Sequence, residues 1–71
     1  MEGKIEFAVF CIENIAIRLH MNASAVYDAL TQQSRILTSY IIPNYDILHT
    51  QGKEYIVYDI ITVMREEGVL V

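Results

Sequence analysis

The longest regular pattern of apolar and polar positions in the chain begins near Lys4 and ends near His20. Apolar residues recur there at spacings of three and four, which is the period of an α-helix. At about 100° per residue, one wide face of this helix carries six apolar residues, namely Ile5, Ala8, Ile12, Ile15, Ala16 and Leu19. A narrow polar strip on one flank consists of Glu2, Glu6, Glu13 and His20. The pattern predicts a helix that packs its wide face into a core.

The opposite side of this first helix is also apolar, because Phe7, Phe10 and Ile17 lie there beside Asn14. A helix that is apolar on two sides is normally covered on two sides. Leaving a Phe or Ile side chain in water forgoes roughly 1.5–3 kcal/mol of stabilisation. Two alternatives stay open: later helices of the same chain cover this side, or a partner protein does. The second alternative makes Phe7, Phe10, Asn14 and Ile17 a predicted partner-binding set.

Two shorter helical patterns follow. Asn22 or Ser24 is a suitable N-cap for a helix that extends to about Gln33. Its inward-facing residues are expected to be Val26, Ala29 and Leu30. A third helical piece covers residues 35–42 and is expected to stop there, because Pro43 disfavours helical geometry at the residue before it.

The last third of the chain predicts a turn of helix and then a longer helix. Asn44 is expected to cap the turn over residues 45–50, and Gly52 is expected to close it in a left-handed conformation. The final helix covers residues 53–67 and ends at Gly68, with a core stripe of Val57, Ile60, Ile61 and Met64. The apolar tail, residues 69–71, is expected to pack back or to complete a partner's surface.

These patterns together predict an all-α fold, a compact bundle of four to five short helices in one domain covering residues 1–71. Only the segment "EYIVYDIITV" is rich enough in β-branched residues to compete as a strand. Cys11 is the single cysteine, so no disulfide can form within the chain. Stability must therefore come from helix packing or from association.

Composition and charge narrow the classes of function. The chain is 54% hydrophobic with a net charge of −4, and its mean hydropathy is +0.31. Its five Lys and Arg residues form no basic cluster, which argues against nucleic-acid binding. The longest apolar run, residues 7–12, is far below the ~18 residues of a membrane span, and the start of the chain lacks the basic region of a signal peptide. We expect a cytoplasmic protein without membrane contact.

Candidate catalytic and metal-binding residues are few. His49 could act as a general base with Tyr45 or Tyr55 as hydrogen-bond donors, but no nucleophile lies at a recognisable spacing. The competing interpretation places His49 at a helix end, where histidine complements the helix dipole. Cys11 lies among apolar neighbours and is expected to be a packed thiol, and the two histidines and the cysteine lack metal-ligand spacing. We therefore expect no enzyme activity, no cofactor and no metal.

The segment "IAIRLHMNASAVYDAL" is typical of a helix-turn-helix corner. Ala16 and Val26 are ten residues apart, the spacing at which a small residue lets two helices cross closely. His20 occupies the turn position where such motifs usually have glycine. A degenerate helix-turn-helix DNA-binding regulator is therefore the alternative function, although its second helix has no Lys or Arg before Arg35 and carries Asp28.

A second candidate interface lies on the last helix, opposite its core stripe. Tyr55, Tyr58, Asp59 and Thr62 are expected to share that side. Tyrosines often anchor protein contacts, although two tyrosines can equally be ordinary exposed residues. We include these four residues in the predicted partner-binding set.

Three phrases, "FAVFCIENIA", "IIPNYDILHTQGKEYIV" and "DIITVMREEGVL", carry a resemblance over nearly the whole chain. It resembles a family of very small all-helical bacterial proteins of unknown function that share a phrase like "IIPxYDxLHTQG". The resemblance implies a gene neighbourhood that includes a family similar to ADP-ribosyltransferase-type toxins. It implies an antitoxin-like or accessory protein partner, or a homo-oligomer, and it assigns no functional residues.

Overall fold

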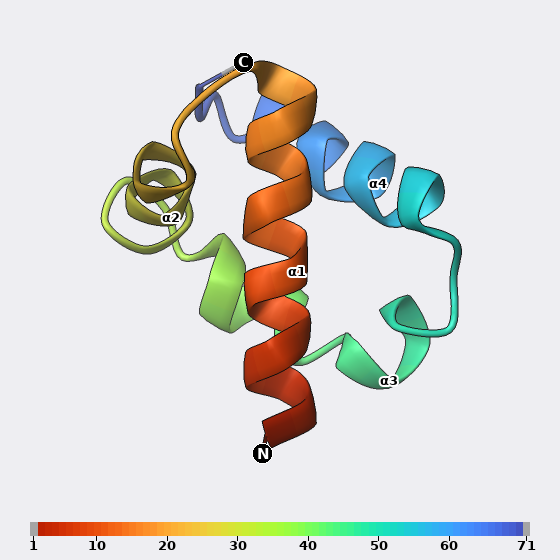
Figure 1. The fold of residues 1–71 in the computed structure, drawn as a ribbon. Helices are drawn as coiled ribbons and strands as arrows, with labels where there is room; N and C mark the ends of the chain where they lie inside the picture. Colours follow the sequence, from red (N-terminus) through yellow and green to blue (C-terminus); the bar gives the residue numbers. More distant parts are fainter. Residues whose placement is uncertain (1, 71) are drawn as a thin grey trace.

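The elements of the fold are all helical (Figure 1). The computed structural model describes the backbone of residues 2–70 and the side chains of residues 3–70. In chain order the elements are α1 (Glu2–Leu19), α2 (Ala23–Thr31), the π-helix η1 (Leu37–Ile41), α3 (Tyr45–Leu48) and α4 (Lys53–Glu66). Residues 2–70 contain no strand, so the predicted all-α bundle is confirmed.

Helix α1 is the axis around which the other elements are arranged. In the view of Figure 1 it runs the full height of the molecule, with α2 on one side and α3 and α4 on the other. No other described element crosses in front of α1 in this view. The chain therefore covers α1 from behind and from both flanks.

Apolar side chains from every longer segment form the core. The largest side chains with no exposed surface are Ile15, Leu30, Ile36, Ile41, Ile60 and Met64. The predicted inward faces of α2 (Val26, Ala29 and Leu30) and of α4 (Val57, Ile60, Ile61 and Met64) are all buried. The two predicted core stripes are therefore confirmed. The physical reason is that each of these helices has one apolar side and packs it against the core.

The predicted inward face of α1 needs a correction at its first turns. Ile5 was expected in the core and is 59% exposed, whereas Phe7 and Cys11 are buried. Tyr45, at the start of α3, lies edge-on to Phe7 with ring centroids 5.4 Å apart. Because α3 packs on the Phe7 side, burial near the start of α1 shifts around the helix and leaves Ile5 in solvent.

The corner between α1 and α2 is closed by backbone hydrogen bonds. The Met21 N–H donates to the Ala16 carbonyl at 2.9 Å and the His20 N–H donates to the Ile17 carbonyl at 3.2 Å. His20 has a left-handed φ of 58°, as its place in the predicted turn required. This bond pair is a Schellman motif with histidine in the usual glycine position. Ala16 and Val26 are both buried, so the close corner is built as the sequence pattern predicts.

Replacing His20 by glycine is expected to stabilise the protein. A residue with an L side chain in the left-handed region costs roughly 1–2 kcal/mol of stability. Glycine removes this strain, but its greater conformational freedom in the unfolded chain offsets part of the gain. We expect the free energy of unfolding of His20→Gly to rise by about 0.5–1 kcal/mol, measured by urea unfolding. His20→Val, which is β-branched, is the control and should be destabilised. A lower stability for His20→Gly would show that the histidine side chain makes a contact worth more than the strain.

Segment 35–42 contains the predicted third helical piece, but as a π-helix over Leu37–Ile41, which is wider than an α-helix. Its backbone bonds include one from the Ile42 N–H to the Leu37 carbonyl at 3.0 Å, five residues back. Pro43 has no N–H to continue an α-helical ladder. The predicted stop before Pro43 is confirmed, because the helix ends at Ile41 with Ile42 as its C-cap. Ile42 itself nevertheless keeps helical angles (φ −66°, ψ −47°), so Pro43 ends the helix without moving Ile42 out of the helical region.

The two glycines at helix ends differ. Gly52 has φ −70° and ψ 157°, an extended conformation at the N-cap of α4, so the predicted left-handed closure of α3 is wrong. The preceding backbone instead ends α3 with turn bonds such as Gln51 N–H to the Leu48 carbonyl. Gly68 has φ +71° and ends α4 in a Schellman motif, with the Val69 N–H bonded to the Met64 carbonyl at 2.9 Å.

The apolar tail packs back in part. Val69 is buried, Leu70 is 41% exposed, and Val71 lies outside the described residues. Across residues 2–70, no helix combines the length and the apolar character that crossing a membrane requires.

Candidate partner-binding surface

The predicted α1 set divides into one buried and three accessible residues. Phe7 was expected on the outer side of α1, but it is only 8% exposed. The prediction is wrong for this residue because Tyr45 of the chain's own α3 packs against it. Phe10 is 37% exposed and Ile17 is 71% exposed. Asn14 is half-buried, and its Nδ2 donates to the Phe10 carbonyl at 2.8 Å.

Val9 extends this exposed surface. It is 48% exposed, and at about 100° per residue it shares a broad exposed arc of α1 with Phe10 and Ile17. Glu6 and Glu13, both exposed, lie on the same side. We call these five residues the α1 outer strip. It combines apolar side chains with carboxylates and contains no lysine or arginine.

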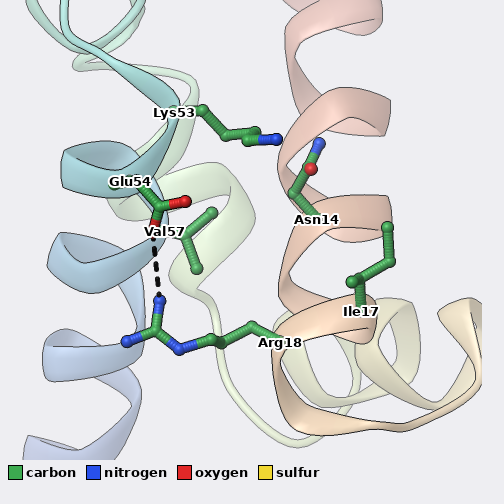
Figure 2. A pocket seen from close by; sticks show the side chains of 6 residues that line it. All are labelled: Asn14, Ile17, Arg18, Lys53, Glu54 and Val57. Atoms are coloured by element: carbon green, nitrogen blue, oxygen red, sulfur yellow. Dashed lines mark ion pairs between the residues drawn. The ribbon is translucent and has the colours of Figure 1, made fainter.

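The strip is bordered by a small hollow between α1 and α4 (Figure 2), which we call the α1–α4 hollow. It encloses about 120 Å³. Figure 2 shows side chains of the two helices facing each other across it. The Arg18 Nη1 lies 3.6 Å from the Glu54 Oε1, and Asn14 and Ile17 line the α1 side. Since both partners of this ion pair are well exposed, the pair adds little stability.

The predicted set on α4 also divides. Tyr55 and Tyr58 are 54% and 61% exposed. Asp59 and Thr62 are half-buried and bonded within the chain. The Asp59 carboxylate accepts a 2.5 Å hydrogen bond from the Tyr40 hydroxyl, and the Thr62 hydroxyl donates to the Tyr58 carbonyl at 2.8 Å. The two tyrosines are therefore the members of this set that present free contact surface.

The Tyr40–Asp59 bond ties η1 to α4. Because the Tyr40 hydroxyl donates to a carboxylate and is partly removed from water, the pKa of Tyr40 is raised to about 12. Asp59 is thus held in place by a residue 19 positions earlier, a role that the helix pattern of α4 alone does not reveal.

Cys11 is a packed thiol, as predicted. Its side chain is fully buried, and burial raises its pKa to about 12. A thiol of this kind is a poor nucleophile at neutral pH because the thiolate is the reactive form.

A larger open hollow of about 330 Å³ lies between α1 and α3, and we call it the α1–α3 hollow. The Tyr45 and His49 rings stack there with centroids 4.3 Å apart and an interplanar angle of 12°. The His49 Nδ1 is 2.7 Å from the Tyr45 carbonyl, within hydrogen-bonding distance. Phe7 and Phe10 are also stacked, with centroids 6.2 Å apart. The hollow is thus lined by aromatic rings from two helices.

Gly3 allows this aromatic arrangement. A Cβ at position 3 would lie 2.7 Å from the Tyr45 hydroxyl oxygen, which is closer than two such atoms can approach. The absence of a side chain on the first turn of α1 therefore makes room for Tyr45.

The described residues contain no group of three or more His, Cys, Asp or Glu side chains that could hold a metal ion. The sequence paired Tyr45 with His49 as a candidate donor and general base and placed Glu6 in a polar strip on α1, but it did not bring Glu6 next to Tyr45 and His49. The sequence contained one weak signal of this site. Glu6 and Phe10 are four residues apart, as are Tyr45 and His49, so each pair shares a side of its helix.

A family model described as "Protein of unknown function (DUF3791)" matches residues 6–67 of the chain. No curated protein and no solved structure matches it.

Proposed function

The chain belongs to the DUF3791 family of proteins of unknown function, and we propose that it is a non-enzymatic protein-binding module. In this proposal it acts as an antitoxin-like or accessory partner of another gene product, and the α1 outer strip is its main contact surface. The observation that carries the proposal is the exposure of three large apolar side chains of α1, namely Val9, Phe10 and Ile17.

The energetics favour a covered strip. Each large apolar side chain transferred from water to an interface contributes roughly 1.5–3 kcal/mol when fully buried. Phe10 and Ile17 are seven residues apart, two turns along the same side of α1, a spacing that suits an elongated partner such as a helix. Tyr55 and Tyr58 on α4 offer a second contact surface with low entropic cost.

One observation favours the alternative of DNA binding, namely the close α1–α2 corner with His20 at its turn. The exposed side of α2 opposes that alternative. It carries Asp28, which bonds to Gln33 at 3.0 Å, and no lysine or arginine lies in α2. A recognition helix without positive charge lacks the phosphate contacts that supply most DNA affinity.

The test is to co-express the protein with the product of the adjacent gene and to measure co-purification and the mass in solution. We expect the wild-type protein to associate, and Ile17→Asp to weaken association on the order of tenfold or more. Ile47→Asp is the matched control, because Ile47 is an exposed isoleucine (66%) on α3, away from the strip.

Both variants should keep the helical circular dichroism of the wild type, since both side chains are already exposed. The proposal would be contradicted if the protein remained monomeric and formed no complex with the adjacent gene product. Retention of the protein on duplex DNA at physiological salt would favour the helix-turn-helix alternative instead.

A further inference from the structure

We propose that the α1–α3 hollow receives an arginine side chain of the partner protein. This inference rests on the proposed function and specifies the chemistry of the partner. The hollow brings together exposed aromatic surface, an exposed carboxylate and open volume on the same side of α1 as the outer strip.

The aromatic residues supply flat surfaces for a planar cation. Phe7 is held below the surface between Phe10 and Tyr45, while Phe10 keeps 37% of its surface exposed. A guanidinium group is attracted to the face of an aromatic ring and stacks on it, more readily than an ammonium group does.

Glu6 supplies the complementary charge. It lies one helical turn before Phe10, on the same side of α1, and both residues line the hollow. Among the described residues Glu6 forms no ion pair, and no lysine or arginine lines the hollow. A guanidinium lying on the Phe10 ring can also direct N–H groups to a carboxylate, often two at once.

Other occupants fit less well. A purely apolar side chain would remove water from Glu6 without providing a hydrogen-bond donor, which costs free energy. An anionic side chain would be repelled by the same carboxylate and by the chain's net charge of −4. A second copy of this acidic chain is disfavoured by the same net charge. The charge and the aromatic surfaces together select a basic segment of a different protein.

The direct test uses N-acetyl-arginine methylamide as the probe and its citrulline analogue as the uncharged control of nearly equal shape. Binding is followed through the backbone amide signals of the isotopically labelled full chain by NMR titration. We expect the arginine probe to shift the amides of Glu6, Phe10 and His49 with a dissociation constant at least about two- to fivefold lower than that of citrulline.

Two variants and a control locate the binding. Phe10→Leu keeps an apolar side chain without an aromatic face, and Glu6→Gln removes only the charge. Each is expected to weaken arginine binding by about two- to fivefold. Glu66→Gln removes an exposed carboxylate from α4, outside both the hollow and the α1 outer strip, and is expected to leave binding unchanged. Circular dichroism confirms that each variant is folded.

Equal shifts from arginine and citrulline, or arginine shifts that Phe10→Leu and Glu6→Gln leave unchanged, would overturn the inference. Those results would not contradict the proposed function, which depends on the Ile17→Asp co-purification result. Loss of arginine selectivity in both hollow variants, with Glu66→Gln unaffected, would support the inference.

Discussion

Replacing Ile15 by alanine is expected to lower the free energy of unfolding by about 2–5 kcal/mol. Ile15 has no exposed surface and lies in the core between α1 and the helices behind it. Removing three carbons there loses transfer free energy and leaves a cavity that a close-packed interior fills only in part. Since small domains have a total stability of the order of 5–15 kcal/mol, this variant should lose a large share of that stability and unfold at a clearly lower urea concentration.

Ile17→Ala is the matched control, because it makes the same chemical change two residues further along the same helix. Ile17 is 71% exposed, so its truncation is expected to change stability by no more than about 0.5 kcal/mol. Urea unfolding followed by circular dichroism measures both variants. Similar losses of stability at positions 15 and 17 would mean that the inward side of α1 is assigned wrongly.

Raising the pH from 9 to 12 is expected to lower the free energy of unfolding of the protein. The pKa of the Cys11 thiol is raised by burial from its ordinary value of 9.0 to about 12. Between those values the unfolded chain releases a proton that the folded chain keeps. The stabilising contribution is therefore complete below pH 9 and is lost as the pH rises toward 12. At about 1.4 kcal/mol per pKa unit, the loss approaches about 4 kcal/mol at pH 12.

Ionisation of Tyr40 also lowers the free energy of unfolding as the pH rises, over a narrower pH range. Its pKa rises from 10.0 to about 12, chiefly because its hydroxyl donates to Asp59, so its contribution is lost between pH 10 and 12. The hydroxyl is partly exposed, which limits this contribution to about 1 kcal/mol.

Urea unfolding at pH 8, 9, 10 and 11 measures the alkaline loss of stability. Cys11→Ala is expected to be less stable at pH 8, by about 1 kcal/mol, yet to lose much less stability between pH 9 and 11. Tyr40→Phe should remove only the part of the loss that occurs above pH 10. A Cys11→Ala variant whose stability falls as steeply as that of the wild type would show that thiol ionisation does not drive alkaline unfolding.

The candidate surface was only partly predictable from the sequence. Helical period correctly placed Phe10, Ile17, Tyr55 and Tyr58 away from the main apolar stripes, because spacing alone determines which side chains share a side of a helix. The same reasoning placed Phe7 outside, but α3 covers it. Asp59 belonged to the predicted interface, yet Tyr40 bonds to it from another segment.

The sequence by itself determined the features that depend on neighbours within a few residues. The stripe of α4, the inward residues of α2, the end of α4 at Gly68 and the tight turn at His20 all follow from helical period and local backbone preference.

Tertiary structure alone decided which side of α1 is buried near Ile5 and how Gly52 is used. It also brought the pair Glu6 and Phe10 next to the pair Tyr45 and His49 to form the α1–α3 hollow. The physical reason is that burial and site geometry depend on which segments pack against each helix. Residues about 40 positions apart can contact each other without any periodic pattern in the sequence, so helical period cannot predict such contacts.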